Sequence, residues 1–155
     1  LDKTRGVPVV VNTAARNSTG VARYGQTLKS TLGELGRTMV TLWVINRQRD
    51  SLELLADYLD AMPAGADHQV HVVRNGYFGS TEKFQLYNGS QLKKRIEEAG
   101  GLTLDFPDLA DRVADQMATQ RLTIQGALKE MPLGHRAELI RWRDEAFKVL
   151  GQVMT

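Results

Sequence analysis

The sequence predicts an α/β protein whose mostly parallel sheet is flanked by helices, with a helical segment at its C-terminal end. Short runs rich in β-branched residues alternate along the chain with segments whose apolar residues recur every three or four positions. The first pattern is typical of buried strands and the second of amphipathic helices. Strands that alternate with helices indicate a parallel sheet with right-handed crossovers. We expect the 155 residues to form a single domain, because this length suffices for one sizeable hydrophobic core.

The composition is that of an ordinary globular protein, with 42% hydrophobic and 25% charged residues. The absence of cysteine excludes disulfides, thiolate metal sites and cysteine nucleophiles. No apolar run is long enough to predict a transmembrane helix and no secretion leader is recognisable, so we expect a cytoplasmic protein without a membrane span. The net charge of +2 and the pI near 9.0 are too mild to establish nucleic-acid binding by themselves.

The first predicted strand covers residues 7–12, with the sequence VPVVVN. Its near-continuous run of valines suits a strand that is buried on both faces of a sheet. Pro8 has no amide hydrogen, so we expect it at the start of the strand or at a sheet edge. A loop then leads to a helix that Gly36 is expected to close. The apolar stripe of that helix consists of Val21, Tyr24, Leu28, Leu32 and Leu35.

The next two predicted strands are residues 38–46, TMVTLWVIN, and residues 68–75, HQVHVVRN. Both are rich in β-branched residues and largely apolar. Trp43, on the earlier of the two, is expected to lie in the core. Between these strands, Asp50 and Glu53 have the spacing of a capping box, which predicts the start of a helix.

Residues 76–88 form a predicted loop that is rich in glycine and aromatic residues. Its aromatic side chains either fold back onto the domain or contact a partner, and long loops of this kind are often functional. Ser90 is predicted to cap a short helix that ends at Gly100. A fourth, short strand is expected at 102–107. Helices are then expected at residues 108–119, 121–130 and 133–151.

Candidate binding residues lie where the predicted strands end, because ligands bind at the carboxyl ends of the strands in open parallel sheets. Asn12, Asn46 and Asn75 each close a strand. An asparagine side chain has both donors and an acceptor, which suits reading a nucleobase edge or holding a polar loop. The alternative is that asparagine is simply a favoured residue at a strand end. His68 and His71 are three apart on one strand, point to opposite faces and make a poor metal pair.

Four stretches of the chain follow one another in the order VVVNTAA, TLWVINRQRDSLELLADYLDAMP, VHVVRNGYFG and LDFPDLADRVADQM. Together they resemble ATPases of the ParA/MinD type, the deviant P-loop class. Within it, the plasmid-encoded StbB, MobD or TraL-like proteins, linked to plasmid stability and conjugal transfer, are the most similar. The resemblance spans residues 7 to about 130 and depends on the order and spacing of these motifs. It implies that the chain corresponds to the C-terminal two-thirds of such an ATPase, with the P-loop strand and helix upstream of residue 1.

The resemblance also implies a nucleotide site. Asn75 matches the asparagine that faces the nucleotide base, and Pro107 and Asp108 match a loop near the same base. Asn12 matches the acidic residue at the metal-facing end of a strand, and here the sequence departs from the family. An amide lacks the negative charge with which a carboxylate holds Mg²⁺. ATP and Mg²⁺ are therefore implied by the family alone.

No catalytic residue is assigned, because the P-loop pattern G-x-x-x-x-G-K-[ST] does not occur in the chain. Phosphoryl transfer depends on the positioning and charge that a P-loop lysine and a metal supply. The family implies ATP hydrolysis, and whether this chain retains it stays open at this point.

Two functions stay open for this fold. The first is a ParA-like ATPase, as a fragment or a degenerate homologue, that acts in plasmid stability, partition or conjugal DNA transfer as a nucleotide-dependent homodimer. The second is a non-hydrolysing interaction module that binds a DNA-processing or segregation partner. An unrelated α/β hydrolase or transferase is disfavoured, because no nucleophile–base pair is recognisable. Exposed basic side chains would contact DNA phosphates. The candidates are Lys93, Lys94, Arg95, Arg141 and Arg143, whose alternative role is on solvated helix faces.

Overall fold

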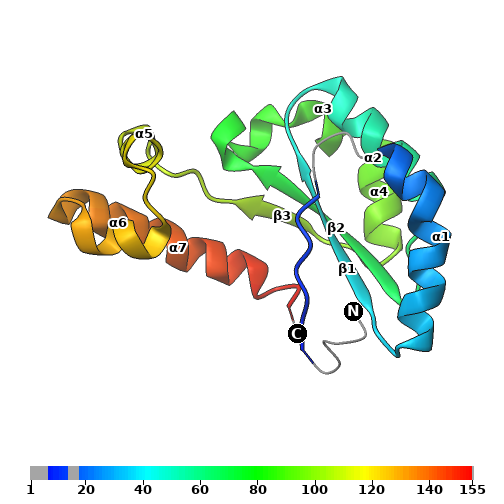
Figure 1. Ribbon diagram of the computed structural model, residues 1–155. Coiled ribbons are helices and arrows are strands. Elements are labelled where there is room, and N and C mark those ends of the chain that lie inside the picture. Colours follow the sequence, from blue (N-terminus) through cyan, green and yellow to red (C-terminus); the bar gives the residue numbers. More distant parts are fainter. Residues whose placement is uncertain (1–6, 14–17, 155) are drawn as a thin grey trace.

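The computed structural model describes residues 7–13 and 18–154 (Figure 1). Its described elements alternate between helix and strand in the first two-thirds of the chain and are helical at the end. In chain order they are α1 (Ser18–Glu34), β1 (Met39–Ile45), α2 (Arg49–Ala61), β2 (His68–Asn75), α3 (Gln85–Asn88), α4 (Gln91–Glu98), β3 (Thr103–Phe106), α5 (Asp111–Gln120), α6 (Ile124–Glu130) and α7 (Leu133–Leu150). Short 3₁₀ turns at Gly76–Phe78 and Thr81–Lys83 join β2 to α3.

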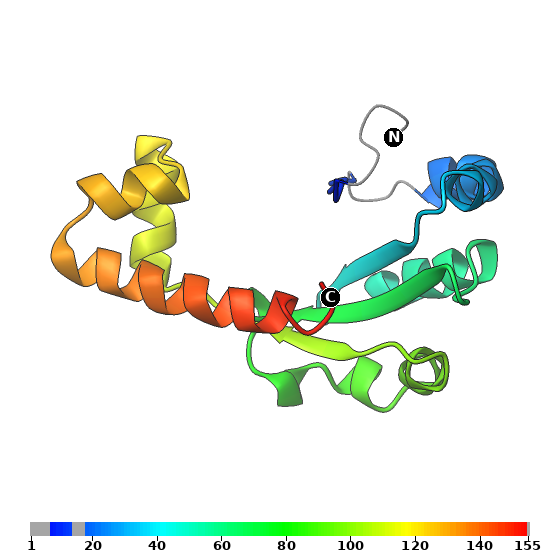
Figure 2. The same cartoon turned by 90° about the horizontal axis from the view of Figure 1, so that it is seen from below.

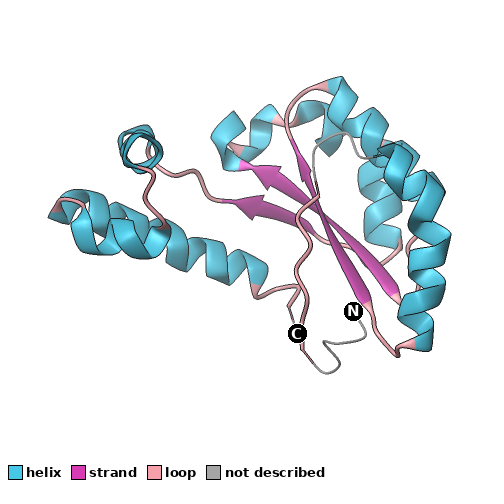
Figure 3. Ribbon diagram, in the orientation of Figure 1, coloured by secondary structure: helices cyan, strands magenta, loops and turns pink. Residues whose placement is uncertain are grey.

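Within the described residues, three strands form a parallel sheet in the order β1-β2-β3 (Figure 3). Leu42 of β1 lies opposite His71 of β2, and Val73 of β2 lies opposite Leu104 of β3. Helices connect the successive strands, as parallel pairing requires. The predicted class, an α/β protein with a parallel sheet flanked by helices and a helical C-terminal segment, is therefore confirmed.

One face of the sheet is covered by α2 and α4, as the figures show (Figures 1 and 2). Trp43 is half-buried on this face and its ring lies 4.9 Å from that of Tyr58, which agrees with its predicted place in the core. The amphipathic stripes of both helices supply the apolar surface that a parallel sheet needs on its faces. The buried side chains of this core are Ile45, Leu55, Tyr58, Leu59, Met62, Val70, Val72, Phe84, Tyr87 and Ile96.

The opposite face of the sheet is covered by the C-terminal end of α7 near β2 and β3. Val153 is buried there with Val73 and Leu104. Nearer β1, the same face is open, because Val40 and Val44 are 44% and 58% exposed. Along this sheet, therefore, burial decreases from β3 toward β1.

The strand predicted at residues 7–12 is wrong. In the described part of the chain these residues pair with no strand, and Val10 and Val11 are 86% and 73% exposed. Figure 2 shows the segment set apart from the sheet. The Nη1 atom of Arg37 donates a hydrogen bond of 3.3 Å to the carbonyl oxygen of Val7. β-Branched residues favour an extended backbone, but a strand also needs a neighbouring edge to pair with, and local propensity does not provide one.

Of the residues predicted to cap or close a helix, three agree with the structure and the capping box at Asp50 does not, and α5 and α6 begin three residues later than expected. Gly36 and Gly100 have positive φ angles of 60° and 78° just beyond α1 and α4, a conformation that glycine adopts without strain. Ser90 Oγ accepts a hydrogen bond of 3.2 Å from the amide of Lys93 and caps α4 as predicted. The capping box at Asp50 is wrong, because α2 begins at Arg49 and Glu53 pairs with the Arg49 guanidinium at 2.8 Å.

Of the two alternatives for the aromatic side chains of the loop 76–88, folding back onto the domain holds for Phe84 and Tyr87. Phe84 and Tyr87 are each 1% exposed and belong to the core between the sheet and α2 and α4. The Tyr87 hydroxyl lies 2.9 Å from the Oγ1 atom of Thr103 on β3. Tyr77 differs from them, since it is 70% exposed.

Helices α5, α6 and α7 form an arm that extends from the carboxyl end of β3 away from the other helices (Figure 1). The arm has an apolar core of its own, which is centred on Val113 of α5, Ala127 of α6 and Leu139 of α7. Trp142 of α7 packs edge-on against Phe106 of β3, with ring centroids 5.8 Å apart. Trp142 is thus half-buried in packing and joins the arm to the sheet.

Both strand histidines are buried, and burial lowers the pKa of each from the ordinary value of 6.5. His71 Nδ1 accepts a hydrogen bond of 3.0 Å from the amide of Leu102, so its protonation would break this bond. Because the folded-state pKa is depressed, the stabilisation is complete above pH 6.5 and is lost as the pH falls toward the folded-state pKa.

We therefore expect the free energy of unfolding to decrease as the pH is lowered from 7 to 5. One proton contributes a slope of at most about 1.4 kcal/mol per pH unit. The substitution His71→Gln keeps an acceptor and removes the titration, so urea unfolding at each pH should give a shallower slope for the variant. An identical slope in both proteins would contradict this assignment.

Candidate functional site

The carboxyl ends of β1, β2 and β3 lie at one edge of the sheet, where α/β proteins bind their ligands. The segments that leave this edge begin at Asn46, Asn75 and Pro107. In each case a polar or conformationally special residue follows an apolar strand and turns the chain away from the sheet. The predicted base-facing residues Asn75, Pro107 and Asp108 are thereby placed on neighbouring segments.

Gly76 is where the segments after β2 and β3 touch. A Cβ atom built on Gly76 would lie 2.5 Å from the carbonyl oxygen of Phe106 and 2.9 Å from the amide nitrogen of Asp108. Any side chain at this position would therefore collide with backbone atoms of the other segment. The glycine lets the two segments meet and brings Asn75 next to Pro107 and Asp108.

The amide side chain of Asn75 shapes its own turn. Its Oδ1 atom accepts a hydrogen bond of 3.1 Å from the amide of Tyr77. Asn46 does the same at the end of β1, where its Oδ1 atom accepts a 2.7 Å bond from the amide of Gln48. Side chains alternate along a strand, so Asn75 belongs to the sheet face that carries α7. Among the described residues the Nδ2 atom of Asn75 has no hydrogen-bond partner, so it is available as a donor at this edge.

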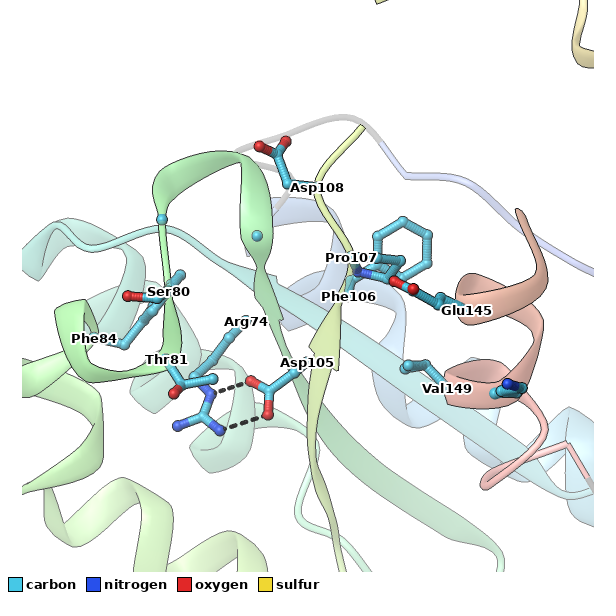
Figure 4. Close-up of a pocket in the computed structure, with 13 residues that line it drawn as sticks. Arg74, Ser80, Thr81, Phe84, Asp105, Phe106, Pro107, Asp108, Glu145 and Val149 are labelled. Carbon is cyan, nitrogen blue, oxygen red and sulfur yellow. Dashed lines mark hydrogen bonds and ion pairs between the residues drawn. The ribbon is translucent and has the colours of Figure 1, made fainter. Parts of the chain in front are cut away.

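Arg74 fixes the loop that follows β2. Its guanidinium makes a two-pronged ion pair with Asp105, directly opposite on β3, at 2.6 and 2.9 Å. It also donates a 2.7 Å bond to Asn88 Oδ1, and Asn88 Nδ2 in turn donates to the carbonyl oxygen of Thr81. Bidentate pairs of this kind have fixed geometry. The network ties Asn88 and Thr81 of this loop to the sheet. Figure 4 shows its ion pair between Arg74 and Asp105.

A cavity of about 570 Å³ opens at this edge, between the loop after β2, the end of β3 and α7 (Figure 4). Its volume falls within the range of small-molecule sites. Asp105, Asp108 and Glu145 contribute carboxylates, whereas Arg74 and Lys148 contribute cations, so the wall is mixed in charge with more acidic than basic groups. The full lining consists of Arg74, Gly76, Gly79, Ser80, Thr81, Phe84, Asp105, Phe106, Pro107, Asp108, Glu145, Lys148 and Val149.

Helix α7 holds the segment after β3 in place. The indole nitrogen of Trp142 donates a 2.9 Å bond to the carbonyl oxygen of Pro107, and Arg141 donates a 3.3 Å bond to that of Asp108. Glu138 accepts a 3.4 Å bond from the amide of Ala110. The hydrogen bonds from Arg141 lower the pKa of the Glu138 carboxyl. The arm therefore helps to hold the segment after β3, which carries Pro107 and Asp108, in position.

Arg141 lies between two carboxylates, at 2.7 Å from both Glu138 and Glu145. These hydrogen bonds raise its pKa further above its ordinary value. A guanidinium engaged in this way has little capacity left for a DNA phosphate. Arg143, two residues further on, makes an exposed 3.0 Å pair with Asp144.

The other predicted DNA contacts lie elsewhere, on α4. Lys93 pairs with Glu97, and Arg95 reaches α2, where it pairs with Asp60 at 2.7 Å. For Lys94, no ion pair occurs among the described residues. The structure thus places the five basic candidates on two separate helices, and most of them already have an acidic neighbour.

Asn12 is exposed and lies in the unpaired segment 7–13. No hydrogen bond among the described residues joins it to the edge that carries Asn75 and Pro107.

Within the same residues, no three histidine, aspartate or glutamate side chains come together as a metal-binding group. Across the described helices, none has both the length and the apolar character needed to cross a membrane.

Apart from Asp108, sequence reasoning did not single out the charged residues of the cavity. Arg74 and Asp105 could have been found, because oppositely charged residues near the ends of two neighbouring strands can pair across a sheet. Glu145 and Lys148 gave no local signal, since they lie on α7, about forty residues beyond β3 in the sequence.

Comparison with known proteins places the chain beside one curated relative. It is 62% identical over 146 residues to a protein named "Protein MobD" from Acidithiobacillus ferrooxidans. The match covers 94% of this chain and 63% of the relative, so the chain spans somewhat less than two thirds of the length of that protein. No protein-family profile and no solved structure matches the chain. Over nearly its whole length, the chain is a close homologue of this MobD protein.

Proposed function

We propose that the chain binds the adenosine part of a nucleotide at the carboxyl edge of its sheet and acts in plasmid mobilisation or the related processes of plasmid stability and partition. The observation that carries the proposal is the contact of Gly76 with Phe106 and Asp108. It brings Asn75 next to Pro107 and Asp108, and these last two residues line a cavity. Asn75, Pro107 and Asp108 are the residues that a ParA-like protein would direct at a base.

The role in mobilisation is supported by the relative's name. MobD is among the plasmid-encoded proteins that the four sequence stretches resemble, and the identity of 62% makes a shared role the natural inference. Since the chain spans 63% of that relative, the activity of the whole protein is part of the proposal.

The residues at the edge fit the base and the ribose. Asn75 offers an unused amide donor, Pro107 offers an apolar ring surface, and the carboxylates of Asp105 and Asp108 suit hydroxyl groups. The cavity is large enough for a nucleoside. We assign base contact to Asn75 and Pro107 and sugar contact to Asp108.

The residues do not fit the Mg²⁺–triphosphate end of ATP. The cavity wall carries more carboxylates than cations, and phosphates would be repelled by them. Asn12 is an amide, lies away from the edge, and has no carboxylate cluster to join among the described residues. No hydrolytic step follows from these residues.

The alternative function, a non-hydrolysing module that binds a DNA-processing or segregation partner, is favoured by a specific observation. The arm formed by α5, α6 and α7 extends away from the sheet (Figure 1). It carries exposed apolar side chains that do not belong to its own apolar core. A nucleotide-dependent homodimer and direct DNA contact by Lys94 or the other basic candidates are further proposals on the same fold.

Two matched asparagine variants test the proposal. Asn75→Leu and Asn46→Leu each remove an amide that caps its own turn, so both should lose a similar amount of stability, about 1 kcal/mol. Only Asn75→Leu removes the donor to the base. In calorimetric titrations with adenosine, we expect its affinity to fall about tenfold, as the loss of one hydrogen bond near 1.4 kcal/mol implies, with Asn46→Leu unchanged.

The cellular role is tested by mobilisation frequency. A plasmid whose copy of this gene is deleted should transfer poorly and be rescued by the wild-type gene and by the Asn46→Leu variant. The Asn75→Leu variant should rescue it less well. Full rescue by Asn75→Leu together with unchanged adenosine affinity would refute the nucleotide site, while normal transfer of the deleted plasmid would refute the role in mobilisation.

A further inference from the structure

A second concave surface lies on the arm, whose helices Figure 1 shows, between α6 and α7. It shares no lining residue with the cavity at the sheet edge. It has a volume of about 380 Å³. Its lining consists of Leu128, Leu133, Arg136, Ala137, Ile140 and Arg143. We call this surface the arm groove. None of its residues takes part in the nucleotide site.

The arm groove belongs to a longer apolar stripe on α7 and the residues after it. On α7, Leu133, Ile140 and Phe147 are spaced seven apart and are 74%, 41% and 66% exposed, and Met154, beyond the end of the helix, is 62% exposed. Residues seven apart in a helix lie on one face, and a seven-residue apolar repeat is the pattern by which helices pair with other helices. The opposite face of α7 is already used, because Leu139 and Ala146 are buried.

The charge at the arm groove is basic. Its lining includes two arginines and no acidic residue. The Nε atom of Arg136 is buried and has no hydrogen-bond partner among the described residues, which is costly unless a ligand supplies an acceptor. Arg143 pairs with Asp144, but both side chains are exposed, and such a pair is weak enough to be exchanged for a better one.

We propose that the arm groove docks an amphipathic helix of another protein, with apolar residues at heptad spacing and carboxylates that face Arg136 and Arg143. The apolar stripe specifies the helical form of the partner, and the two guanidiniums specify its acidic flank. A second copy of α7 would bring the same two arginines to the interface, and its Glu138 and Glu145 are already paired with Arg141. Nucleic acid would satisfy the arginines but would leave the four apolar side chains of the groove against phosphate and water.

The probe for this proposal is a fluorescein-labelled synthetic helix of about three heptads, with leucine at the apolar positions and glutamate on the flanks. We expect the protein to bind it, measured by fluorescence anisotropy, and to bind a version with lysine in place of glutamate at least about tenfold more weakly. The double variant Arg136→Glu/Arg143→Glu should reverse this preference. Lys129→Glu, an exposed charge change on α6 outside the groove, is the matched control and should leave binding unchanged.

Two variants test the apolar part of the groove, and Leu133→Ser does so without a change of charge. Ile140→Glu should abolish binding of the acidic helix, and since Ile140 is 41% exposed the variant should fold, which circular dichroism checks. If Ile140→Glu does not fold, Leu133→Ser takes its place in the test. Leu133 lies at the more exposed end of the groove, and this variant should weaken binding of the acidic helix.

Three outcomes would overturn the proposal. Equal affinity for the acidic and basic helices, or none for either, would show that the groove does not select an acidic helix. Self-association in sedimentation velocity that Ile140→Glu abolishes would assign the stripe to a second copy. Duplex DNA that displaces the acidic helix and loses affinity in the double variant would assign the groove to nucleic acid. None of these results depends on nucleotide binding at the sheet edge.

Discussion

Replacing Phe84 by alanine is expected to lower the free energy of unfolding by about 3–5 kcal/mol, the usual cost of truncating a buried phenylalanine. Phe84 is 1% exposed and anchors the loop after β2 in the core. Folded proteins of this kind are stabilised by about 5–15 kcal/mol in total. The variant would therefore lose a large share of its stability, which urea unfolding would measure.

The same loop supplies the control. Tyr77→Ala removes an aromatic side chain that is 70% exposed, and surface substitutions of this kind change stability by about 0.5 kcal/mol or less. Equal losses for Phe84→Ala and Tyr77→Ala would show that the loop does not pack as described. Because Phe84 also lines the cavity, Phe84→Ala should weaken adenosine binding even under conditions where the variant is fully folded.

Replacing Leu139 by alanine is expected to cost about 2–5 kcal/mol. Leu139 is fully buried at the centre of the core that α5, α6 and α7 share. Its loss should loosen the arm, and with it the hydrogen bond from Trp142 to the carbonyl oxygen of Pro107. Hydrogen exchange should therefore increase in the arm and in the segment after β3, and much less in β1.

Leu133→Ala on the same helix is the matched control. Leu133 is 74% exposed, and alanine is the better helix former, so we expect no loss of stability. If Leu139→Ala leaves hydrogen exchange at Pro107–Asp108 unchanged, the arm does not support the site, and the two parts are independent.

The sequence predicted most of the fold because its elements are locally consistent. The strands β1 and β2 are β-branched runs of ordinary length, and the helices carry clear apolar stripes with recognisable ends such as Ser90 and Gly100. The run at residues 7–12 has the same local character and still forms no ladder among the described residues. The difference between it and β1 is the presence of a paired neighbour, which no local pattern reports.

The site could be predicted only in part, for a related reason. The asparagine at the end of β2 and the proline after β3 were identifiable, because a parallel sheet gathers its strand ends at one edge. The contact of Gly76 with Phe106 and the support from Trp142 join residues about 30 and 35 positions apart. Such contacts depend on how loops and helices pack in three dimensions, and no periodicity in the sequence encodes them.

The measurement that tests the central claim most directly is photolabelling with 8-azidoadenosine, followed by mass spectrometry of the peptides. A base held between Asn75 and Pro107–Asp108 should label the segments 75–78 and 105–108, and excess adenosine should prevent the labelling. The Asn75→Leu variant should be labelled less and Asn46→Leu as much as the wild type. Labelling elsewhere in the chain, or labelling that adenosine does not compete, would contradict a nucleoside site at the carboxyl edge of this sheet.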